Sequence, residues 1–577
     1  MISDSINHIS IFSKWINIIY ETTILNGGSY SNVLSIYSKI KEISDKTTEL
    51  FKNSTYSFGM NLNEYVKLSV DEDLTDFIKS ESSAIFIVGA SGSGKTTALR
   101  NFVNSIAQNI NVIVSLPKLT TMHMPSLSLF FDFDLSDINE VSFLSLLNTA
   151  LKERNEMLVL ILDGLNEINC KIEDQSYFYV YLVELAEKLF NNTCQNIKLI
   201  ITCRERAYYQ YRSCTSMQLN RMYFYQNKNY QKSIENNDYS YHIHSLNKKE
   251  KEELINKYIN NAKETENLTF LLENIETTPF MIAAAATTLQ SYPYVDVRNI
   301  YNCFTSAMLN KLMESEKYLA RKVIYTYFDL ILQHKFNNFE VTKFKIIDKL
   351  PLEYHDKLND LIWQLIDINI LSDDSRSIRF QHDKVEEFFF KEYIEENEYN
   401  GIAFFNDILE LSYKNVIYQG GLLQYIQDLI KKKKLKMFKD IAISFFEQYF
   451  DTVSRIIVEA LATANDLQSV LEYLITVNDS VDSTKFINLI IWGLDDCLQD
   501  YSIINFDFED IIDKLLIISK NNYIVCEKKS NLYYLKSKIH YFKNDFLKSK
   551  DLANQALEFI DTSNVILLSQ IKVHMSI

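Results

Sequence analysis

Glycine and proline are scarce in this chain. Its 577 residues include 11 glycines and five prolines, and no proline follows Pro351. The proline-free part suits long helices, because proline breaks a helix in its interior. Three glycines, Gly89, Gly92 and Gly94, fall within six residues. Such a cluster in a glycine-poor chain indicates a backbone conformation that other residues adopt poorly.

Other absences narrow the class of protein. No apolar run reaches the roughly 18–20 residues that a membrane-spanning helix needs. Asp4 precedes the first lysine, Lys14, which is the wrong charge order for a secretory signal. The seven cysteines form no CxxC pair, so we expect reduced thiols in a cytoplasmic protein rather than a disulfide or metal framework.

The charge balance disfavours non-specific binding to nucleic acid. The formal net charge is −16, and a phosphate backbone repels such a chain. One basic run, "KKKKLKMFK" at 431–439, stands against this trend. It has a single aromatic residue, Phe438, and we expect it to be a solvated helix end.

Hydrophobic residues make up 47% of the chain, which indicates a folded globular protein. Four short apolar runs, at 84–88, 111–116, 158–162 and 197–202, alternate with helical segments. Continuous apolar strands of this kind predict an α/β domain, with a parallel sheet covered by helices on both faces. Residues 208–240 are rich in tyrosine, asparagine and glutamine, and we expect a surface insertion there.

The rest of the chain has sequence patterns that are typical of helices. Residues 360–395 combine a helix, a turn, a short strand and a second helix, which suggests a winged helix. Residues 531–560 resemble one tetratricopeptide unit, with a plain helical bundle as the alternative. The expected domains are an N-terminal helical segment (1–60), a nucleotide-binding domain (61–245), a helical domain (246–305), a winged-helix domain (306–400) and a repeat-like helical region (401–577).

The strongest motif is "GASGSGKT", which satisfies GxxxxGK[ST] between a strand and a helix. Glycines let successive N–H groups point at phosphate oxygens, and the following helix adds the positive end of its dipole. Lys95 would reach the β and γ phosphates, and Thr96 would hold Mg²⁺. The expected phosphate-binding residues are Gly89, Ala90, Ser91, Gly92, Ser93, Gly94, Lys95, Thr96 and Thr97.

Two further strand ends complete a hydrolytic site. In "LVLILDGLNEI", Asp163 ends a buried strand, the usual position of the carboxylate that holds Mg²⁺. Glu167 lies four residues on and could orient or deprotonate an attacking water. In "IKLIITCRE", Arg204 could contact the γ phosphate bidentately. We expect Lys95, Asp163, Glu167 and Arg204 to carry catalysis.

These three motifs, in this order and spacing, resemble those of the NACHT branch of the STAND signalling ATPases, which include bacterial antiphage proteins. Two later segments resemble motifs of the same family. In "ETTPFMIAA" the resemblance implies that Pro279 lies near the adenine and ribose. In "IRFQHDKVEEFFFKEY" it implies that His382 touches the β phosphate of ADP, although such a histidine is also often purely structural. Asn166 departs from the family, which often has aspartate there.

The resemblance implies a slow ATP hydrolase that works as a switch. ADP would hold the resting form, and ATP would allow self-association in response to a protein trigger or effector that contacts the C-terminal helices or the N-terminal segment. Prokaryotic antiphage defence is the natural role. The alternatives are a transcriptional regulator of the same class and a scaffold that binds nucleotide without hydrolysing it. The cofactors implied are ATP or ADP and Mg²⁺.

Overall fold

The computed structural model describes most of the chain. The described residues are 30–53, 66–116, 125–131, 140–168, 172–215, 217–226, 239–243, 246, 248–258, 278–291, 300–334, 341–368, 370–373, 377–444, 450–476, 480–499, 508–543, 545–560 and 564–576. The chain divides into two compact units: Met1–Tyr294 with Ser372–Arg376, and Val295–Leu371 with Ser377–Ile577. Each unit is described by itself below.

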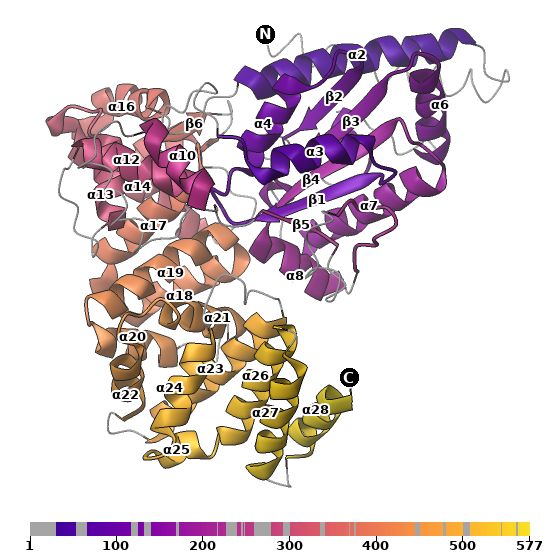
Figure 1. Ribbon diagram of the computed structural model, residues 1–577. Coiled ribbons are helices and arrows are strands. Elements are labelled where there is room, and N and C mark those ends of the chain that lie inside the picture. The colour runs from indigo at the N-terminus through magenta and orange to yellow at the C-terminus, as the bar shows by residue number, and fades with distance from the viewer. Residues whose placement is uncertain are drawn as a thin grey trace. The chain divides into compact units, whose positions relative to one another are not determined.

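The first unit is an α/β structure (Figure 1). Its strands are β1 (Ala84–Gly89), β2 (Ile110–Ser115), β3 (Met157–Leu162), β4 (Ile197–Arg204) and β5 (Tyr241–His242). Its helices are α2 (Tyr30–Asn53), α3 (Ser69–Lys79), α4 (Lys95–Ser105), α5 (Ser128–Phe131), α6 (Glu140–Glu153), the 3₁₀ turn η4 (Leu165–Glu167), α7 (Ile172–Asn191), α8 (Glu205–Thr215), α10 (Lys248–Tyr258) and α12 (Pro279–Ser291).

The five strands form one sheet in the order β2-β3-β4-β1-β5, and every pair is parallel. The predicted parallel sheet is therefore confirmed. Gly89 lies beside Arg204 in the register of β1 and β4. The carboxyl ends of β1, β3 and β4 meet at one edge of the sheet, and this edge carries the predicted site residues.

Helices cover both faces of this sheet. On one face, Ile87 of β1 and Val159 of β3 pack with Leu74 of α3 and Leu99 of α4 in one buried cluster. On the other face, Phe86 contacts Tyr179 of α7 and Tyr208 of α8, with ring centroids 5.8 and 5.2 Å apart. The apolar residues of β1 alternate between the two faces, as the side-chain period of a strand requires.

The expected surface insertion at 208–240 is wrong for the residues that the structure describes. Helix α8 continues to Thr215, with Tyr208 and Tyr211 fully buried, and Phe224 is fully buried and bridges to Ala84. The tyrosines made the segment look polar in sequence, but each carries a large apolar ring that can be buried. Residues 227–238 lie outside the described residues.

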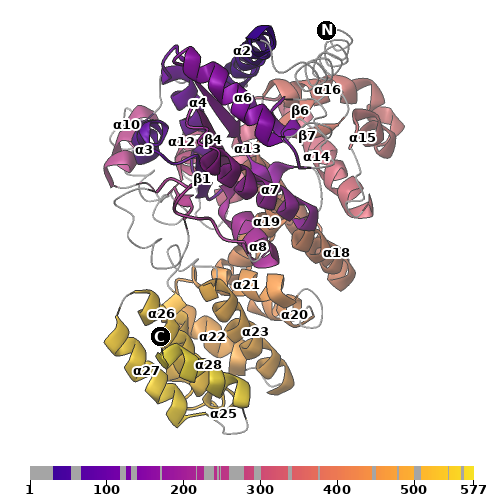
Figure 2. The ribbon, with the colours of Figure 1, turned by 90° about the vertical axis from the view of Figure 1, so that its right-hand side faces the viewer.

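The expected N-terminal segment is described only over α2, since residues 1–29 and 54–60 lie outside the described residues. Helix α2 packs against β2, α4 and α6 (Figure 2). The described part of this segment therefore belongs to the layer of helices around the sheet. The boundaries of the five expected domains stay predictions.

The second unit consists largely of helices. Its helices are α13 (Ile300–Leu309), α14 (Glu314–His334), α15 (Lys343–Lys349), η6 (Leu352–Tyr354), α16 (His355–Asp367), α17 (Asp383–Glu396), η7 (Glu398–Asn400), α18 (Gly401–Lys414), α19 (Val416–Lys431), α20 (Leu435–Ser444), α21 (Phe450–Leu461), α22 (Leu467–Thr476), α23 (Ser480–Gln499), α24 (Phe508–Ile518), α25 (Tyr523–Cys526), α26 (Lys529–Phe542), α27 (Phe546–Glu558) and α28 (Val565–Ser576). Strands β6 (Leu371–Asp373) and β7 (Ile378–Phe380) form a two-stranded sheet. None of the described helices is both long and apolar enough to cross a membrane.

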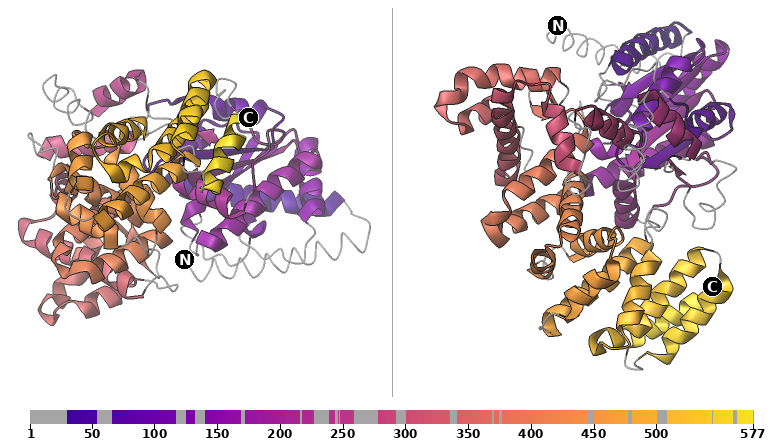
Figure 3. Two further views of the ribbon diagram at one scale, coloured as in Figure 1. Left: turned by 90° about the horizontal axis from the view of Figure 1, so that it is seen from below. Right: turned by 60° about the vertical axis from the view of Figure 1, so that its left-hand side comes forward.

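Two predicted patterns appear in the second unit. Helix α16, strands β6 and β7, and helix α17 follow one another in the order expected at 360–395, although a winged-helix domain stays a prediction. Helices α26 and α27 pack against each other (Figure 3), and Ser537 Oγ donates to Ser549 O at 2.7 Å. Small residues thus lie at the expected helix contact, while a repeat array also stays a prediction.

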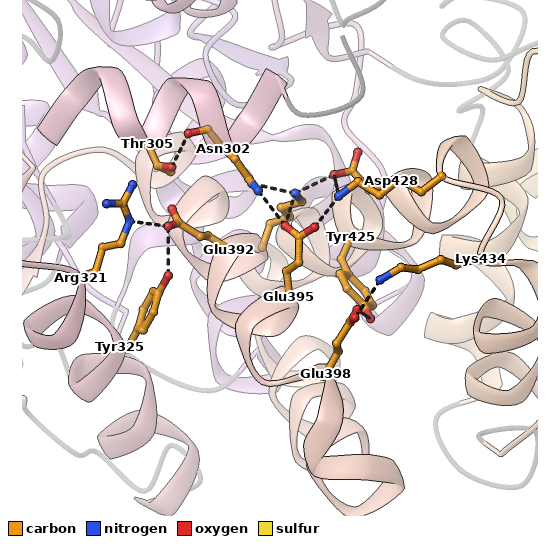
Figure 4. A network of polar contacts seen from close by, with 12 residues as sticks. Asn302, Thr305, Arg321, Tyr325, Glu392, Glu395, Glu398, Tyr425, Asp428 and Lys434 are labelled. Carbon is orange, nitrogen blue, oxygen red and sulfur yellow. Dashed lines mark hydrogen bonds and ion pairs between the residues drawn. The ribbon is translucent and has the colours of Figure 1, made fainter. Parts of the chain in front are cut away.

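Helix α17 carries a network of charged side chains, which we name the α17 network (Figure 4). Lys391 is fully buried and lies 2.6 Å from Asp428 and 2.8 Å from Glu395. Arg321 of α14 donates to Glu392 at 2.7 Å. The network connects α13, α14, α17 and α19. We assign to it Asn302, Arg321, Tyr325, Lys391, Glu392, Glu395, Glu398, Tyr425, Asp428, Lys432 and Lys434.

The basic run at 431–439 is a helix end, as its sequence predicts, but it is only partly solvated: Lys433, Lys434 and Lys436 are exposed, and other lysines of the run have partners or are buried. Lys432 pairs with Glu395, and Lys434 lies 2.8 Å from Glu398. Lys439 is buried in the middle of α20. The run supplies counter-charges to Glu395 of α17 and Glu398 of η7, which lie 37 and 36 residues away in sequence.

Candidate active site

The predicted phosphate loop connects β1 to α4. Gly92 and Gly94 have φ angles of +78° and +95°, in the left-handed region that favours glycine. A Cβ atom added at Gly89 would lie 2.8 Å from Ser93 Oγ. The three clustered glycines therefore occupy positions where a side chain would be strained or would clash. This is the backbone reason that the sequence indicated.

Lys95 is the first residue of α4, and its side chain turns back over the loop. Its ammonium donates to Gly89 O at 2.7 Å and to Ala90 O at 2.8 Å. Burial and then the charge of Arg204 lower the pKa of Lys95 to about 8, against the opposing effect of Asp163 and Glu167. A cation held by neutral carbonyls beside a second cation is well prepared to bind an anion.

Asp163 follows β3 and is nearly buried. Its Oδ1 accepts a hydrogen bond from Thr202 Oγ1 at 2.7 Å, and Thr202 Oγ1 accepts one from the N–H of Gly164 at 2.8 Å. Thr202 is fully buried in β4. One hydroxyl therefore fixes both the Asp163 carboxylate and the turn that leads to Glu167.

Asn166 performs a role that the sequence did not indicate. Its Oδ1 accepts a hydrogen bond from the backbone N–H of Arg204 at 2.9 Å. Gln175 of α7 donates to Ile168 O at 2.8 Å and accepts from Tyr211 OH at 2.7 Å. The turn that carries Glu167 is thus tied to the end of β4, and an amide suffices for that bond.

Glu167 and Arg204 lie at the same sheet edge. The Glu167 side chain folds back toward Gly164, since a Cβ atom added at Gly164 would lie 2.9 Å from Glu167 Cδ. Gly164 has φ +93°, so the turn requires glycine for two reasons. Arg204 ends β4 beside Gly89 and is nearly buried. The structure therefore brings Lys95, Asp163, Glu167 and Arg204 together.

Helix α12 begins against the phosphate loop. The N–H of Phe280 donates to Gly92 O at 3.3 Å, and a Cβ atom added at Gly92 would lie 2.7 Å from Phe280 Cβ. Pro279 Cγ lies 3.7 Å from the Cβ position of Gly94. Thr278 Oγ1 accepts from the N–H of Met281 at 3.2 Å and caps the helix. Pro279 is thus the one predicted residue from outside 61–245 that the first unit places at the loop.

His382 lies in the second unit, as the N-cap of α17. Its Nδ1 accepts a hydrogen bond from the backbone N–H of Lys384 at 3.1 Å. This contact matches the structural alternative that the sequence left open. Contact between His382 and a β phosphate stays a prediction.

Four residues of the site escaped the sequence reading: Thr202, Gln175, Phe280 and Ile243. Ile243 follows β5, and its Cβ lies 3.3 Å from the Cβ position of Gly89. Strand β5 has only two residues, too few to show a pattern. Thr202 alone carried a signal, as a polar residue inside an apolar strand two positions before Arg204.

The residues present fit a nucleoside triphosphate with Mg²⁺. The loop N–H groups, Lys95 and the N-terminus of α4 would hold the phosphates, and Thr96 and Asp163 would hold the ion. The described residues contain no cluster of three or more His, Cys, Asp or Glu suited to a metal. A magnesium site of this type does not need one, because phosphate oxygens and waters supply the other ligands.

Comparison with known protein families gives one match. A model of the AAA domain matches residues 78–207, which include the phosphate loop, Asp163 and Arg204. These residues therefore form a P-loop ATPase domain similar to the AAA type. The match does not reach Pro279 or His382. A comparison with curated proteins finds no match.

Solved structures show only distant likeness. A Walker-type ATPase of Pyrococcus abyssi is 11% identical, covers 59% of this chain and 99% of its own, and has a TM-score of 0.30. The ORC2 protein of Aeropyrum pernix in its ADPNP and ADP complexes is 12% identical over 60% of this chain and 98% of its own, with a TM-score of 0.27. Drosophila ORC bound to DNA is 17% identical over 52% of this chain and 86% of its own, with a TM-score of 0.23. Scores this low carry no argument about function.

Proposed function

We propose that this chain is a slow ATPase of the NACHT type, in which exchange of ADP for ATP switches the protein from a resting to a self-associating form. The docking of α12 on the phosphate loop carries the proposal. Helix α12 has 13 residues, begins with Pro279 and covers the phosphate loop from outside the core nucleotide domain. A motor or a kinase does not require such a helix. A switch requires such a part, because something must distinguish the two nucleotide states. The role in prokaryotic antiphage defence rests on the sequence resemblance alone.

The contact between α12 and the loop is built to respond to nucleotide. The carbonyl of Gly92 accepts from the N–H of Phe280, one of the N–H groups that a helix leaves without an internal partner at its start. Bound phosphates would draw the loop N–H groups toward them and fix the orientation of Gly92. The position of α12 on the phosphate loop would then depend on how many phosphates the loop holds. Pro279, beside Gly94, would contact the base or sugar of the nucleotide.

The residues at the sheet edge divide the remaining work. Bound Mg²⁺ would stabilise the charge that develops on the phosphates. Thr202 orients the Asp163 carboxylate toward that ion, and Asn166 holds the turn on which Glu167 sits. Glu167 would orient or deprotonate the attacking water, and Arg204 would contact the γ phosphate.

The energies suit a switch. Moving a two-state balance from 1:99 to 99:1 requires about 5.5 kcal/mol of differential binding. A hydrogen bond to a charged group contributes about 1.5–3 kcal/mol. Two to four contacts that differ between ADP and ATP would suffice, and Arg204 and His382 are two candidates. Slow turnover is acceptable in such a machine, because hydrolysis only resets it.

The rate of ADP release tests this proposal. We expect Pro279→Ala to release bound ADP about tenfold faster, since the ring packs beside Gly94 and about 1.4 kcal/mol corresponds to one such packed contact. Pro351→Ala is the matched control, because Pro351 is an exposed proline before η6. Release is followed by stopped-flow fluorescence of a labelled ADP. Equal release rates in all three proteins would refute a gating role for α12.

A further inference from the structure

Helix α2 lies along β2, the outermost strand of the sheet on the side away from β5 (Figures 1 and 2). One side of β2 pairs with β3, with Ile113 beside Leu160. No strand in the described part of the chain pairs with the other side, which is therefore an edge of the sheet. Edge groups of this kind are the usual starting point for unwanted strand pairing.

Hydroxyl groups of α2 bond to that edge. The N–H of Val112 donates to Ser44 Oγ at 2.9 Å, and the N–H of Val114 donates to Thr47 Oγ1 at 3.2 Å. Thr48 Oγ1 donates to Val112 O at 3.1 Å. The spacing of hydroxyl groups along the helix is close to the spacing of edge groups along the strand, because one helical turn rises about 5.4 Å and two strand residues span about 6.6 Å. The helix therefore satisfies the same groups that a further strand would bond.

Over its described side chains, 38–52, the helix has few buried apolar residues. Within this range only Ile40 and Phe51 are buried apolar residues, and Leu50 is 60% exposed. Phe51 lies in the cluster under α4, with Arg100 over its ring at 5.3 Å. By contrast, α3, which has 11 residues, buries Val70, Leu74 and Phe77. This part of α2 is thus fastened to the sheet largely by hydroxyl groups.

Strand β2 carries no protection of its own. Its sequence, INVIVS, has no charged residue and no proline, which are the features that usually prevent edge pairing. Its β-branched residues favour extended pairing with an identical segment. Two copies of this edge can pair with each other. In an antiparallel pair related by a two-fold axis, each strand offers the same backbone N–H and C=O groups to the other.

We propose that α2 is a displaceable cover, and that the β2 edge beneath it pairs with the β2 edge of a second copy of this chain. In the pair, the N–H groups of Val112 and Val114 donate to backbone carbonyls of the other copy instead of to Ser44 and Thr47. Nothing in this contact requires nucleotide, so its test is independent of ATP turnover.

The test removes the three hydroxyls from the full chain. Ser44→Ala, Thr47→Val and Thr48→Val together keep the helix and its size but leave no hydroxyl for the edge. In a solution dilute enough to keep this variant monomeric, we expect the Val112 and Val114 amides to exchange with deuterium at least about tenfold faster than in the wild type, since each lost bond contributes a factor of two or more. The Ile113 amide points to β3 and serves as an internal control in the same strand. As the concentration is raised, we expect a dimer by light scattering, in which carbonyls of the other copy protect the Val112 and Val114 amides again.

Two further variants make the result decisive. Lys41→Ala, Lys46→Ala and Glu49→Ala together change exposed positions of the same helix and should leave exchange and mass as in the wild type. Adding Val112→Pro to the hydroxyl-free variant removes one edge N–H and should return it to a monomer with Ile113 still protected. If the dilute, monomeric variant protects Val112 and Val114 as well as the wild type does, the proposal is overturned. A variant that stays monomeric as its concentration is raised would overturn it equally.

Discussion

Each of the two units holds a cluster of polar side chains inside, and the two clusters are satisfied in different ways. At the phosphate loop, the partners are mostly neutral: carbonyls accept from Lys95, a hydroxyl donates to Asp163, and an amide accepts from the Arg204 N–H. In the α17 network, the partners are charged, with Lys391 between Asp428 and Glu395.

The difference separates a site that can exchange partners from one that cannot. A phosphate can replace the carbonyls around Lys95 without leaving a carboxylate unpaired. Removing Lys391 takes the cation at 2.6 Å from buried Asp428 and leaves Lys432 to pair with both acids, which is costly. We therefore expect changes at the loop to affect nucleotide binding more than stability, and changes in the α17 network to do the reverse.

The largest expected effect is on nucleotide binding by Lys95→Ala. Loss of two charge-assisted hydrogen bonds to phosphate would weaken ATP binding by about 3–6 kcal/mol, while the melting temperature changes little. Calorimetric titration with ATP and a thermal melt measure the two quantities. Wild-type amounts of nucleotide in the purified variant would contradict the role given to Lys95.

The next effect is on stability. We expect Lys391→Met to lower the unfolding free energy of the second unit by about 3 kcal/mol, because buried Asp428 loses its cation at 2.6 Å and keeps Lys432 at 3.8 Å. Lys433→Met is the matched control, since Lys433 is exposed at the end of α19. Urea unfolding measures both. Equal losses in the two variants would show that the network contributes nothing beyond ordinary surface charge.

A smaller effect separates the two roles possible for Asn166. Asn166→Ala removes the acceptor for the Arg204 N–H, and we expect ATP turnover to fall about fivefold to tenfold with ADP affinity retained. Asn166→Asp keeps an acceptor and should restore turnover. If the aspartate variant is as slow as the alanine variant, the hydrogen bond is not what matters at this position.

The smallest effect concerns acid stability. Burial alone would raise the pKa of Glu395, but the charge of Lys391 and hydrogen bonds from Lys391, Lys432 and Asn302 lower it to about 2. A carboxyl with a lowered pKa stabilises the fold above its ordinary pKa of 4.5, and this contribution is lost as pH falls toward 2. Glu395→Gln should therefore cost about 1 kcal/mol at pH 6 and less at pH 3. Urea unfolding at the two pH values checks this, and an equal cost at both would disprove it.

The same comparison explains what the sequence could predict. The four strands, the phosphate loop, Asp163, Glu167 and Arg204 were predictable, because each is a local pattern with a fixed place in a parallel sheet. The six residues of β1 are enough to predict a strand, and the eight residues Gly89–Thr96 are enough to predict a phosphate loop.

The rest depends on contacts between distant residues. The pairing of Lys432 and Lys434 with α17 and the docking of Phe280 on Gly92 join segments far apart in the chain. The same is true of the hydroxyls of α2 on β2. No local pattern marks such a contact. The error at 208–226 and the partial error at 431–439 share this cause: some polar or charged residues, such as Tyr211 and Lys432, make contacts that the local sequence does not indicate.

The most direct test of the switch is to identify the nucleotide in the purified protein and follow its assembly. The protein is denatured, the released nucleotide is separated by chromatography, and the mass of the native protein is measured with ADP and with ATP. We predict bound ADP in a monomer, and assembly with ATP that persists in Glu167→Gln because that variant cannot reset. Rapid continuous hydrolysis by an assembly that is the same with either nucleotide would contradict the account.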